Sequence, residues 1–136
     1  MQAAILLVKL AHLQEDNQRR LAIAEQYLQA LEPIDLTLPH LLPGTTHAMH
    51  LFVIEHAQRD ELRAFLEAAS IGTAIHYPRA VHQQPAYQGR LTGSASLPNT
   101  ERLIPRILSL PMYPELHEDQ VQRVCGCLLA WHENQG

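Results

Sequence analysis

The sequence predicts a small α+β domain in which a three-stranded sheet packs against helices, with a long helix leading into it. Three observations support this prediction. Apolar residues recur at helical spacing over residues 2–31, 59–70 and 118–132. Shorter segments rich in strand-forming residues lie between these stretches. The length of 136 residues suits one domain, and elements in this order pack as layers around one core.

The first 31 residues are predicted to form one long helix. Leu6, Leu10 and Leu13 share one apolar stripe, and a second stripe runs from Leu21 to Leu31. The polar stretch 14–20 is either an exposed turn of this helix or a break between two helices. The absence of Gly and Pro favours the single helix, which Pro33 ends.

The connection at 33–46 carries three prolines and is predicted to lack regular structure, apart from a short strand near 36–38. The later elements are predicted in this order: a central strand at 47–55, a helix at 59–70 ended by Gly72, a strand at 71–77, a long loop at 78–98, a short helix capped by Asn99 or Thr100 and continuing through Ile107, a strand at 108–110 and a helix at 118–132.

Composition and charge argue against several classes of function. A net charge of −4 is unlike the basic footprint of a nucleic-acid binder. No apolar run reaches the roughly 20 residues that cross a bilayer, and the apolar start makes a poor signal peptide. Cys125 and Cys127 point to nearly opposite sides of a helix, so they are not expected to bond to each other, which suits a reducing cytoplasm.

The densest group of chemically useful side chains lies where the strand at 71–77 passes into the loop. His76, Tyr77, His82 and Gln84 crowd this junction, a place where folds usually hold ligands. No metal site is predicted despite nine histidines, because His76 and His82 alone make a poor ligand set.

Several motifs in a fixed order carry a family resemblance. They are Gln2-Ala3-Ala4-Ile5-Leu6 with Lys9-Leu10, then Arg20, Ala24 and Tyr27, then His50-Leu51-Phe52-Val53, then Gly72-Thr73, His76-Tyr77-Pro78, His82, Gln84 and Ala86-Tyr87, then Leu97-Pro98 with Glu101, and finally the run from Leu108 to Leu116. With these motifs the chain resembles the C-terminal part of the DegT/DnrJ/EryC1/StrS family, sugar aminotransferases that use pyridoxal phosphate.

The resemblance implies the small domain of a fold-type I aminotransferase. Residues 1–32 would be the long connecting helix and residues 33–136 the small domain. The family's Schiff-base lysine, the aspartate facing the pyridine nitrogen and the phosphate-binding groups belong to a large domain with no counterpart here. Lys9 is the one lysine of the chain, and the resemblance places it on the connecting helix. We therefore expect no catalytic residue, no bound pyridoxal phosphate and no transamination from this chain alone.

The same resemblance assigns substrate contacts to His76, Tyr77, His82 and Gln84, since the family's loop faces the sugar-nucleotide cleft. Histidine and tyrosine donate hydrogen bonds to sugar or phosphate oxygens while their rings pack on the sugar. In the structural alternative, His76 turns into the core, Tyr77 ends a strand and His82 bonds a loop carbonyl. Arg79 and Arg90 either meet a diphosphate or remain solvated.

Two functions therefore stay open. The first is the C-terminal domain of a sugar-nucleotide aminotransferase, whose partner is a large-domain polypeptide or a second copy of the chain. The second is a non-catalytic binding or protein-interaction module derived from that family. Because a large bare apolar patch is rare, residues from Ile5 to Leu13 are expected to be buried in a homo-oligomer or rearranged to cover the sheet.

Overall fold

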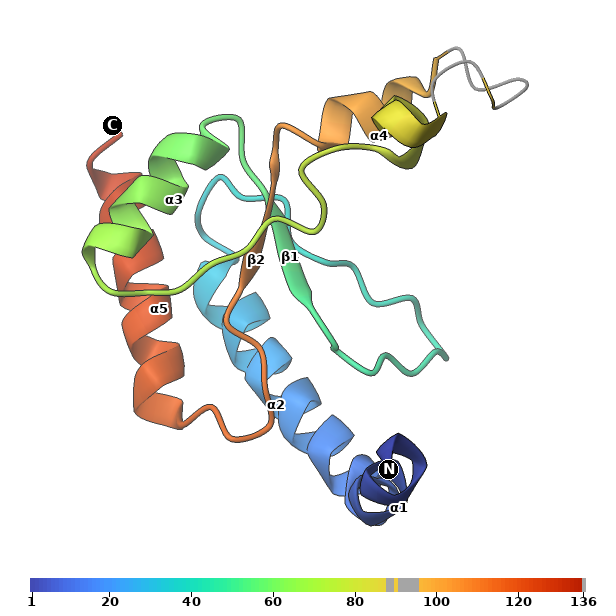
Figure 1. Cartoon of the computed structure of the whole chain (residues 1–136). Helices are drawn as coiled ribbons and strands as arrows, with labels where there is room; N and C mark the ends of the chain where they lie inside the picture. Colours follow the sequence, from blue (N-terminus) through green and yellow to red (C-terminus); the bar gives the residue numbers. More distant parts are fainter. Residues whose placement is uncertain (88–89, 91–95, 136) are drawn as a thin grey trace.

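The structure, a computed structural model, describes residues 1–87, 90 and 96–135. Figure 1 shows a two-stranded sheet with helices packed against it. The elements are α1 (Gln2–Leu10), α2 (Leu13–Leu31), β1 (Phe52–Glu55), α3 (Arg59–Ala68), the 3-10 turns η1 (Val81–Gln83) and η2 (Pro85–Tyr87), α4 (Pro98–Leu103), β2 (Ile107–Leu110) and α5 (Glu118–Glu133). The prediction of an α+β fold is confirmed.

The sheet is smaller than the sequence predicts. β1 and β2 pair antiparallel, with Phe52 opposite Leu110 and Glu55 opposite Ile107. The segments predicted as further strands contribute one isolated bridge each, Thr37 with Glu55 and Ala74 with Ser109. The prediction of three strands was therefore wrong for the described residues.

The segment 71–77 pairs with the outer edge of β2 at one residue. Ser109 and Ala74 exchange two backbone hydrogen bonds, of 2.8 and 3.2 Å. The next backbone groups facing this edge belong to Ile107 and Pro111, two residues away on either side. Pro111 has no N–H to donate, and the carbonyl oxygen of Ile107 accepts a hydrogen bond from Arg59 (2.9 Å). The pairing of Ala74 with Ser109 is an isolated bridge.

The strand predicted at 47–55 begins later, at Phe52. Met49 has a positive φ of 46°, which departs from the extended backbone that a strand requires. Its side chain is nevertheless fully buried. The apolar character of this stretch therefore reflects burial of a bend as well as of a strand.

The N-terminal segment forms two helices instead of the one predicted. The helix is interrupted at Ala11–His12, where the N–H of His12 donates to the carbonyl oxygen of Lys9 at 3.0 Å in a tighter i to i−3 turn. His12 has φ −104° and ψ −5°, and α2 begins at Leu13. Figure 1 shows α1 folded across the end of α2, far from the sheet. The expected rearrangement over the sheet is therefore wrong as well.

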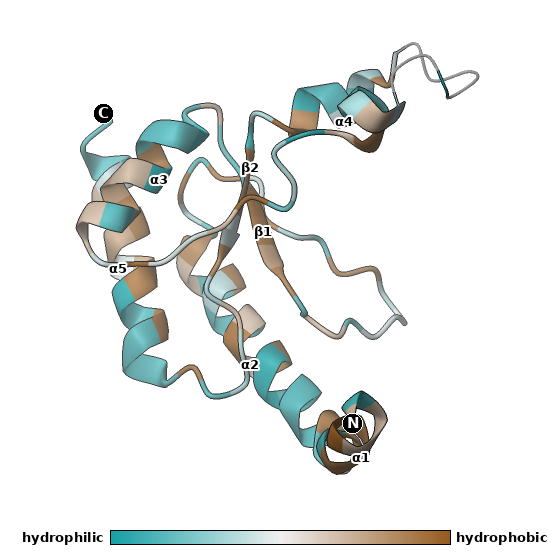
Figure 2. Ribbon diagram, in the orientation of Figure 1, coloured by the Kyte–Doolittle hydropathy of each residue, from teal (hydrophilic) through white to brown (hydrophobic). Residues whose placement is uncertain are grey.

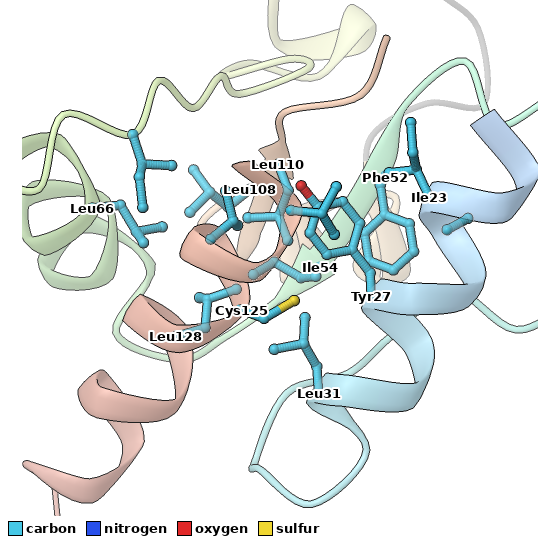
Figure 3. Close-up of a cluster of buried hydrophobic side chains, with 14 of the residues drawn as sticks. Ile23, Tyr27, Leu31, Phe52, Ile54, Leu66, Leu108, Leu110, Cys125 and Leu128 are labelled. Atoms are coloured by element: carbon cyan, nitrogen blue, oxygen red, sulfur yellow. The ribbon is translucent and has the colours of Figure 1, made fainter. Parts of the chain in front are cut away.

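The core lies between one face of the sheet and helices α2, α3 and α5 (Figure 3). Tyr27 and Phe52 pack with ring centroids 5.0 Å apart. Burying each large apolar side chain contributes about 1.5–3 kcal/mol. The fully buried large side chains are Tyr27, Leu31, Met49, Phe52, Ile54, Leu62, Leu66, Leu108, Val121 and Leu128. Because α2 supplies two of these side chains, it belongs to the folded body.

The end of α3 differs from prediction in its stop residue. Ser70, not Gly72, takes the left-handed conformation, with φ 59°. The N–H of Ser70 bonds Glu67 and the N–H of Ile71 bonds Leu66, both at 2.9 Å, which is the Schellman pattern. The helix thus ends at Ala68, and its left-handed stop residue lies two residues before the predicted glycine.

The predicted loop at 78–98 is partly structured. It contains η1 and η2, and α4 begins within it at Pro98, with Leu97 as its N-cap. Neither Asn99 nor Thr100 caps this helix, which ends at Leu103 rather than at Ile107. Residues 88–89 and 91–95 of the predicted loop lie outside the described residues.

The two cysteines lie on α5 and are both free thiols. Cys125 is buried and Cys127 is half-buried, and neither is disulfide-bonded. Burial raises the pKa of the Cys125 thiol to about 11. Over the residues that the structure describes, no helix combines the length and apolar character needed to cross a bilayer.

Candidate functional site

A pocket of about 290 Å³ lies where the chain that follows Ala74, the residue bridged to β2, leaves the sheet and meets α4. One wall comes from the chain at 76–81 and the other from α4 and the start of β2. Four polar or charged residues line it: His76, Tyr77, Arg79 and Thr100. Its apolar lining consists of Ala80, Val81, Leu103, Ile104 and Ile107. Small-molecule sites usually have this composition, with a mostly apolar surface and a few convergent polar groups.

His76 is anchored at the base of this pocket by the sheet. The bridge between Ala74 and Ser109 fixes the backbone two residues earlier. The Nδ1 atom of His76 lies 2.9 Å from Oγ of Ser109, a buried residue of β2. The half-buried imidazole is therefore oriented by a hydrogen bond and does not pack into the apolar core.

Tyr77 follows directly and is 72% exposed, so its ring is available to solvent or to a ligand. The peptide bond joining it to His76 is cis. The two rings meet edge to face with centroids 5.6 Å apart. Exposed aromatic rings held in this way offer both a flat apolar face and a polar edge.

His82 lies behind the wall and does not line the pocket. Its side chain is only 8% exposed, and Nε2 lies 3.0 Å from Oε1 of Glu101 on α4. The same oxygen accepts the N–H of Leu97 at 2.9 Å. These hydrogen bonds, that from Leu97 first, lower the pKa of the Glu101 carboxyl below its usual value.

Gln84 also stays outside the pocket lining. It is half-buried at the end of η1, where its N–H bonds the carbonyl oxygen of Val81 at 3.1 Å. Of the four residues predicted to contact substrate, the structure therefore brings His76 and Tyr77 together in one pocket. It places His82 and Gln84 in the turn that supports the pocket.

Sequence reasoning missed Thr100 and Ser109 as parts of this site. Thr100 reaches the pocket from α4, which begins at Pro98 rather than after the predicted cap at Asn99 or Thr100, and Ser109 comes from a strand distant in sequence. Arg79 lines the pocket, as one of its two predicted roles requires, whereas the described Arg90 does not. The pairing of Leu97 and Glu101 does not follow the common capping-box spacing, so no local signal revealed it.

The chain does not fit pyridoxal phosphate by itself. Such a cofactor needs a lysine amine that can lose its proton, which burial or a neighbouring cation favours. Lys9 is exposed on α1, among leucines that line a groove of about 680 Å³ with Asp16 and Arg20. Figure 1 shows α1 and α4 at opposite ends of the molecule, so this amine is remote from the pocket at His76.

The His, Cys, Asp and Glu side chains of the described part of the chain form no metal-binding cluster. Among residues 1–87, 90 and 96–135, no three His, Cys, Asp or Glu side chains are placed to hold an ion. The chemically useful groups of the pocket are its hydrogen-bonding, aromatic and charged side chains.

The fold defines the class of protein, because it is that of part of an aminotransferase. A crystal structure of DesV from Streptomyces venezuelae matches with a TM-score of 0.92 and 42% sequence identity, covering 98% of this chain and 36% of that one. The family model of the DegT/DnrJ/EryC1/StrS aminotransferases matches residues 1–129. The chain belongs to this family.

Curated relatives agree. The chain is 42% identical over 134 residues to a dTDP-3-amino-3,4,6-trideoxy-alpha-D-glucose transaminase of Streptomyces venezuelae, covering 98% of this chain and 35% of the relative. It is 37% identical over 124 residues to a dTDP-3-amino-3,6-dideoxy-alpha-D-galactopyranose transaminase of Aneurinibacillus thermoaerophilus, covering 91% and 34%. The chain thus spans about a third of the length of these relatives.

Proposed function

We propose that this chain is the C-terminal part of a sugar-nucleotide aminotransferase and supplies one wall of its substrate cleft. Residues 33–136, packed against the buried side of α2, would form the small domain, and residues 1–32 would connect it to a large domain. The observation that carries the proposal is the pocket shared by His76, Tyr77, Arg79 and Thr100. The names of the sugar-transaminase relatives support this reading.

The polar groups of the pocket suit a nucleoside diphosphate sugar. The guanidinium of Arg79 would attract the diphosphate, for which Arg is well shaped. The Tyr77 ring offers a face for a base or a sugar, and His76 and Thr100 offer polar atoms for hydroxyl groups. Leu103 and Ile104 form an apolar surface that excludes water from these contacts.

Calorimetry with dTDP-glucose and UDP-N-acetylglucosamine tests this assignment. The unsubstituted chain should bind at least one of them, and Tyr77→Ala and Arg79→Met should each weaken binding about tenfold, since each removes a contact worth about 1–2 kcal/mol. Tyr87→Ala, at another exposed tyrosine outside the pocket lining, is the matched control and should bind normally. Absence of binding by the unsubstituted chain, or unchanged affinity in both pocket variants, would contradict the proposal.

The chain alone should be catalytically inert, because the reactive amine is supplied elsewhere. Incubation with equimolar pyridoxal phosphate followed by borohydride should leave Lys9 unmodified by mass spectrometry. A Lys9→Arg variant gives the background. Specific labelling of Lys9, or turnover of a keto sugar by the purified chain, would show that the cofactor chemistry resides here.

The surface of α1 is where the rest of the enzyme would dock. No residue of α1 is buried, and Leu6, Leu7 and Leu10 are 63%, 70% and 61% exposed. Figure 2 shows α1 as the most uniformly hydrophobic helix of the molecule. A contiguous apolar surface of this kind usually contacts another protein surface. The proposed occupant is a large-domain polypeptide.

Co-expression tests the occupant. The chain should co-purify with the N-terminal two thirds of the Streptomyces venezuelae transaminase, and Leu6→Glu should abolish this because it places a charge in the interface. Arg63→Glu on the exposed surface of α3 is the control. Self-association without co-purification would assign the surface to a second copy. A monomer that binds neither would overturn the docking proposal.

A further inference from the structure

We propose that Glu101 is a positioning residue that holds the two walls of the pocket together. The inference rests on the proposed function, since it concerns the same pocket. One wall is the turn that begins at Ala80 and Val81, and the other is the face of α4 that carries Thr100 and Ile104. These walls are about 20 residues apart in the sequence and belong to no common sheet or helix.

Among the described residues, the two walls are joined by the hydrogen bond between His82 and Glu101 (3.0 Å). His82 follows Val81 directly in η1, and Glu101 follows Thr100 in α4. A bond between these neighbours therefore fixes the spacing of the pocket-lining residues beside them. A change at this contact would alter the width of the pocket without touching a ligand.

The same carboxylate oxygen also fixes the start of α4. It accepts the N–H of Leu97, the N-cap residue, at 2.9 Å. A helix of six residues has few internal hydrogen bonds, so its stability depends on contacts at its ends. Glu101 thus secures its own helix and the opposing turn through a single atom.

Burial makes this contact obligatory for His82. The imidazole is 8% exposed, and a buried polar ring without a partner is costly. An ionised carboxylate can only accept hydrogen bonds, so Nε2 of His82 must carry the hydrogen. The neutral form of this ring is therefore the Nε2–H tautomer, which is a spectroscopic signature of the contact.

Amide hydrogen exchange on the full chain without ligand provides the first test. In Glu101→Ala, the amides of Gln83 and Gln84 at the end of η1 and of Ile104 at the end of α4 should exchange about tenfold faster, because loss of a charge-assisted bond frees both walls. The amide of Leu62 in α3 should be unchanged. Glu101→Gln keeps an oxygen that can accept both bonds and should restore most of the protection.

Long-range ¹H–¹⁵N spectra of the His82 ring provide the second test. The unsubstituted chain and Glu101→Gln should show the Nε2–H tautomer, and Glu101→Ala should lose this preference. Glu61→Ala, an exposed acidic residue in the first turn of α3, is the matched control and should leave both readouts unchanged.

The outcomes separate this inference from the proposed function. Unchanged exchange and an unchanged tautomer in Glu101→Ala overturn the positioning role, whatever the binding result. Faster exchange confined to η1 and α4, together with weaker binding of dTDP-glucose and rescue by Glu101→Gln, supports it. If the unsubstituted chain binds neither sugar nucleotide, the proposed function fails, while the exchange data still decide whether Glu101 joins the walls.

Discussion

The guanidinium of Arg59 donates a hydrogen bond to the carbonyl oxygen of Ile107 over 2.9 Å, joining the first residue of α3 to the first residue of β2. The same Nη1 atom reaches Ile104 at 3.2 Å, and Nε bonds the carboxylate of Asp60 at 2.7 Å. Arg59 is 8% exposed, so the charge is largely removed from water and is balanced by these partners. The base of the pocket is thus tied to the helical layer.

Replacing Arg59 with Met should lower the free energy of unfolding by about 2–3 kcal/mol. The substitution leaves two partly buried carbonyl oxygens without their charged donor, and hydrogen bonds to charged groups are worth about 1.5–3 kcal/mol. Urea unfolding followed by circular dichroism measures the change. Arg63→Met, four residues later on the exposed side of α3, should change stability by less than about 0.5 kcal/mol. Equal effects at the two positions would contradict the role of Arg59.

Ser70→Gly should stabilise the protein by about 0.5–1 kcal/mol, because Ser70 occupies a left-handed conformation that costs a non-glycine residue about 1–2 kcal/mol. Thermal unfolding at neutral pH measures this gain. Ala69→Gly, one residue earlier with φ −83°, is the control and should destabilise instead. Destabilisation by both glycines would mean that the hydroxyl group of Ser70 matters more than its backbone conformation.

Gly126→Ala should add about 0.5–1 kcal/mol by improving the helix propensity of α5. Gly126 is exposed within α5, and an added Cβ would meet no atom within 4 Å. Gly44→Ala offers the contrast, since it has equal space but a φ of +75° and should destabilise. Unfolding of each variant in guanidinium chloride measures the change in unfolding free energy. Because both positions have room for a Cβ, opposite signs at the two positions would show that backbone conformation decides the outcome. Loss of stability in Gly126→Ala would reveal an unrecognised contact at that helix surface.

The stabilisation contributed by Glu101 should disappear in acid. Because its folded-state pKa lies below the ordinary 4.5, the contribution is fully present above that value and is lost as pH falls through the lower, folded-state pKa. The difference in unfolding free energy between the unsubstituted chain and Glu101→Gln should therefore shrink as pH is lowered past 4.5. When the same two chains are compared in a His82→Phe background, their difference in unfolding free energy should become smaller but persist. The hydrogen bond from the N–H of Leu97 is the larger cause of the lowered pKa of Glu101, and it remains in this background. A difference independent of pH would contradict this assignment.

The main helices were predictable because their apolar stripes are strong local signals. In α5, Val121, Val124, Cys125 and Leu128 keep helical spacing and are all buried. The break at Ala11–His12 was not predictable in the same way, because neither Gly nor Pro marks it.

The number of paired strands and the positions of His82 and Gln84 could not be predicted in this way, because they depend on contacts between residues far apart in the sequence. The segment 71–77 pairs with β2 only through Ala74 and Ser109, and the extent of such pairing depends on a strand that lies more than 30 residues away in sequence. His76 and Tyr77 were predictable as pocket residues from their place at a strand end. His82 has the same composition signal, but its partner Glu101 turns it away from the pocket, and only the tertiary contact reveals this.

The turn at Ala11–His12 has a consequence for how the polypeptide is put together. Because no residue of α1 is buried, folding of the body from α2 onward does not require α1 to have bound a partner. Under the proposed docking of α1, folding of this body and assembly with a large domain would be separate events. The folded body and the exposed apolar surface of α1 are then present at the same time, and only the surface of α1 has to be complementary to the proposed large domain.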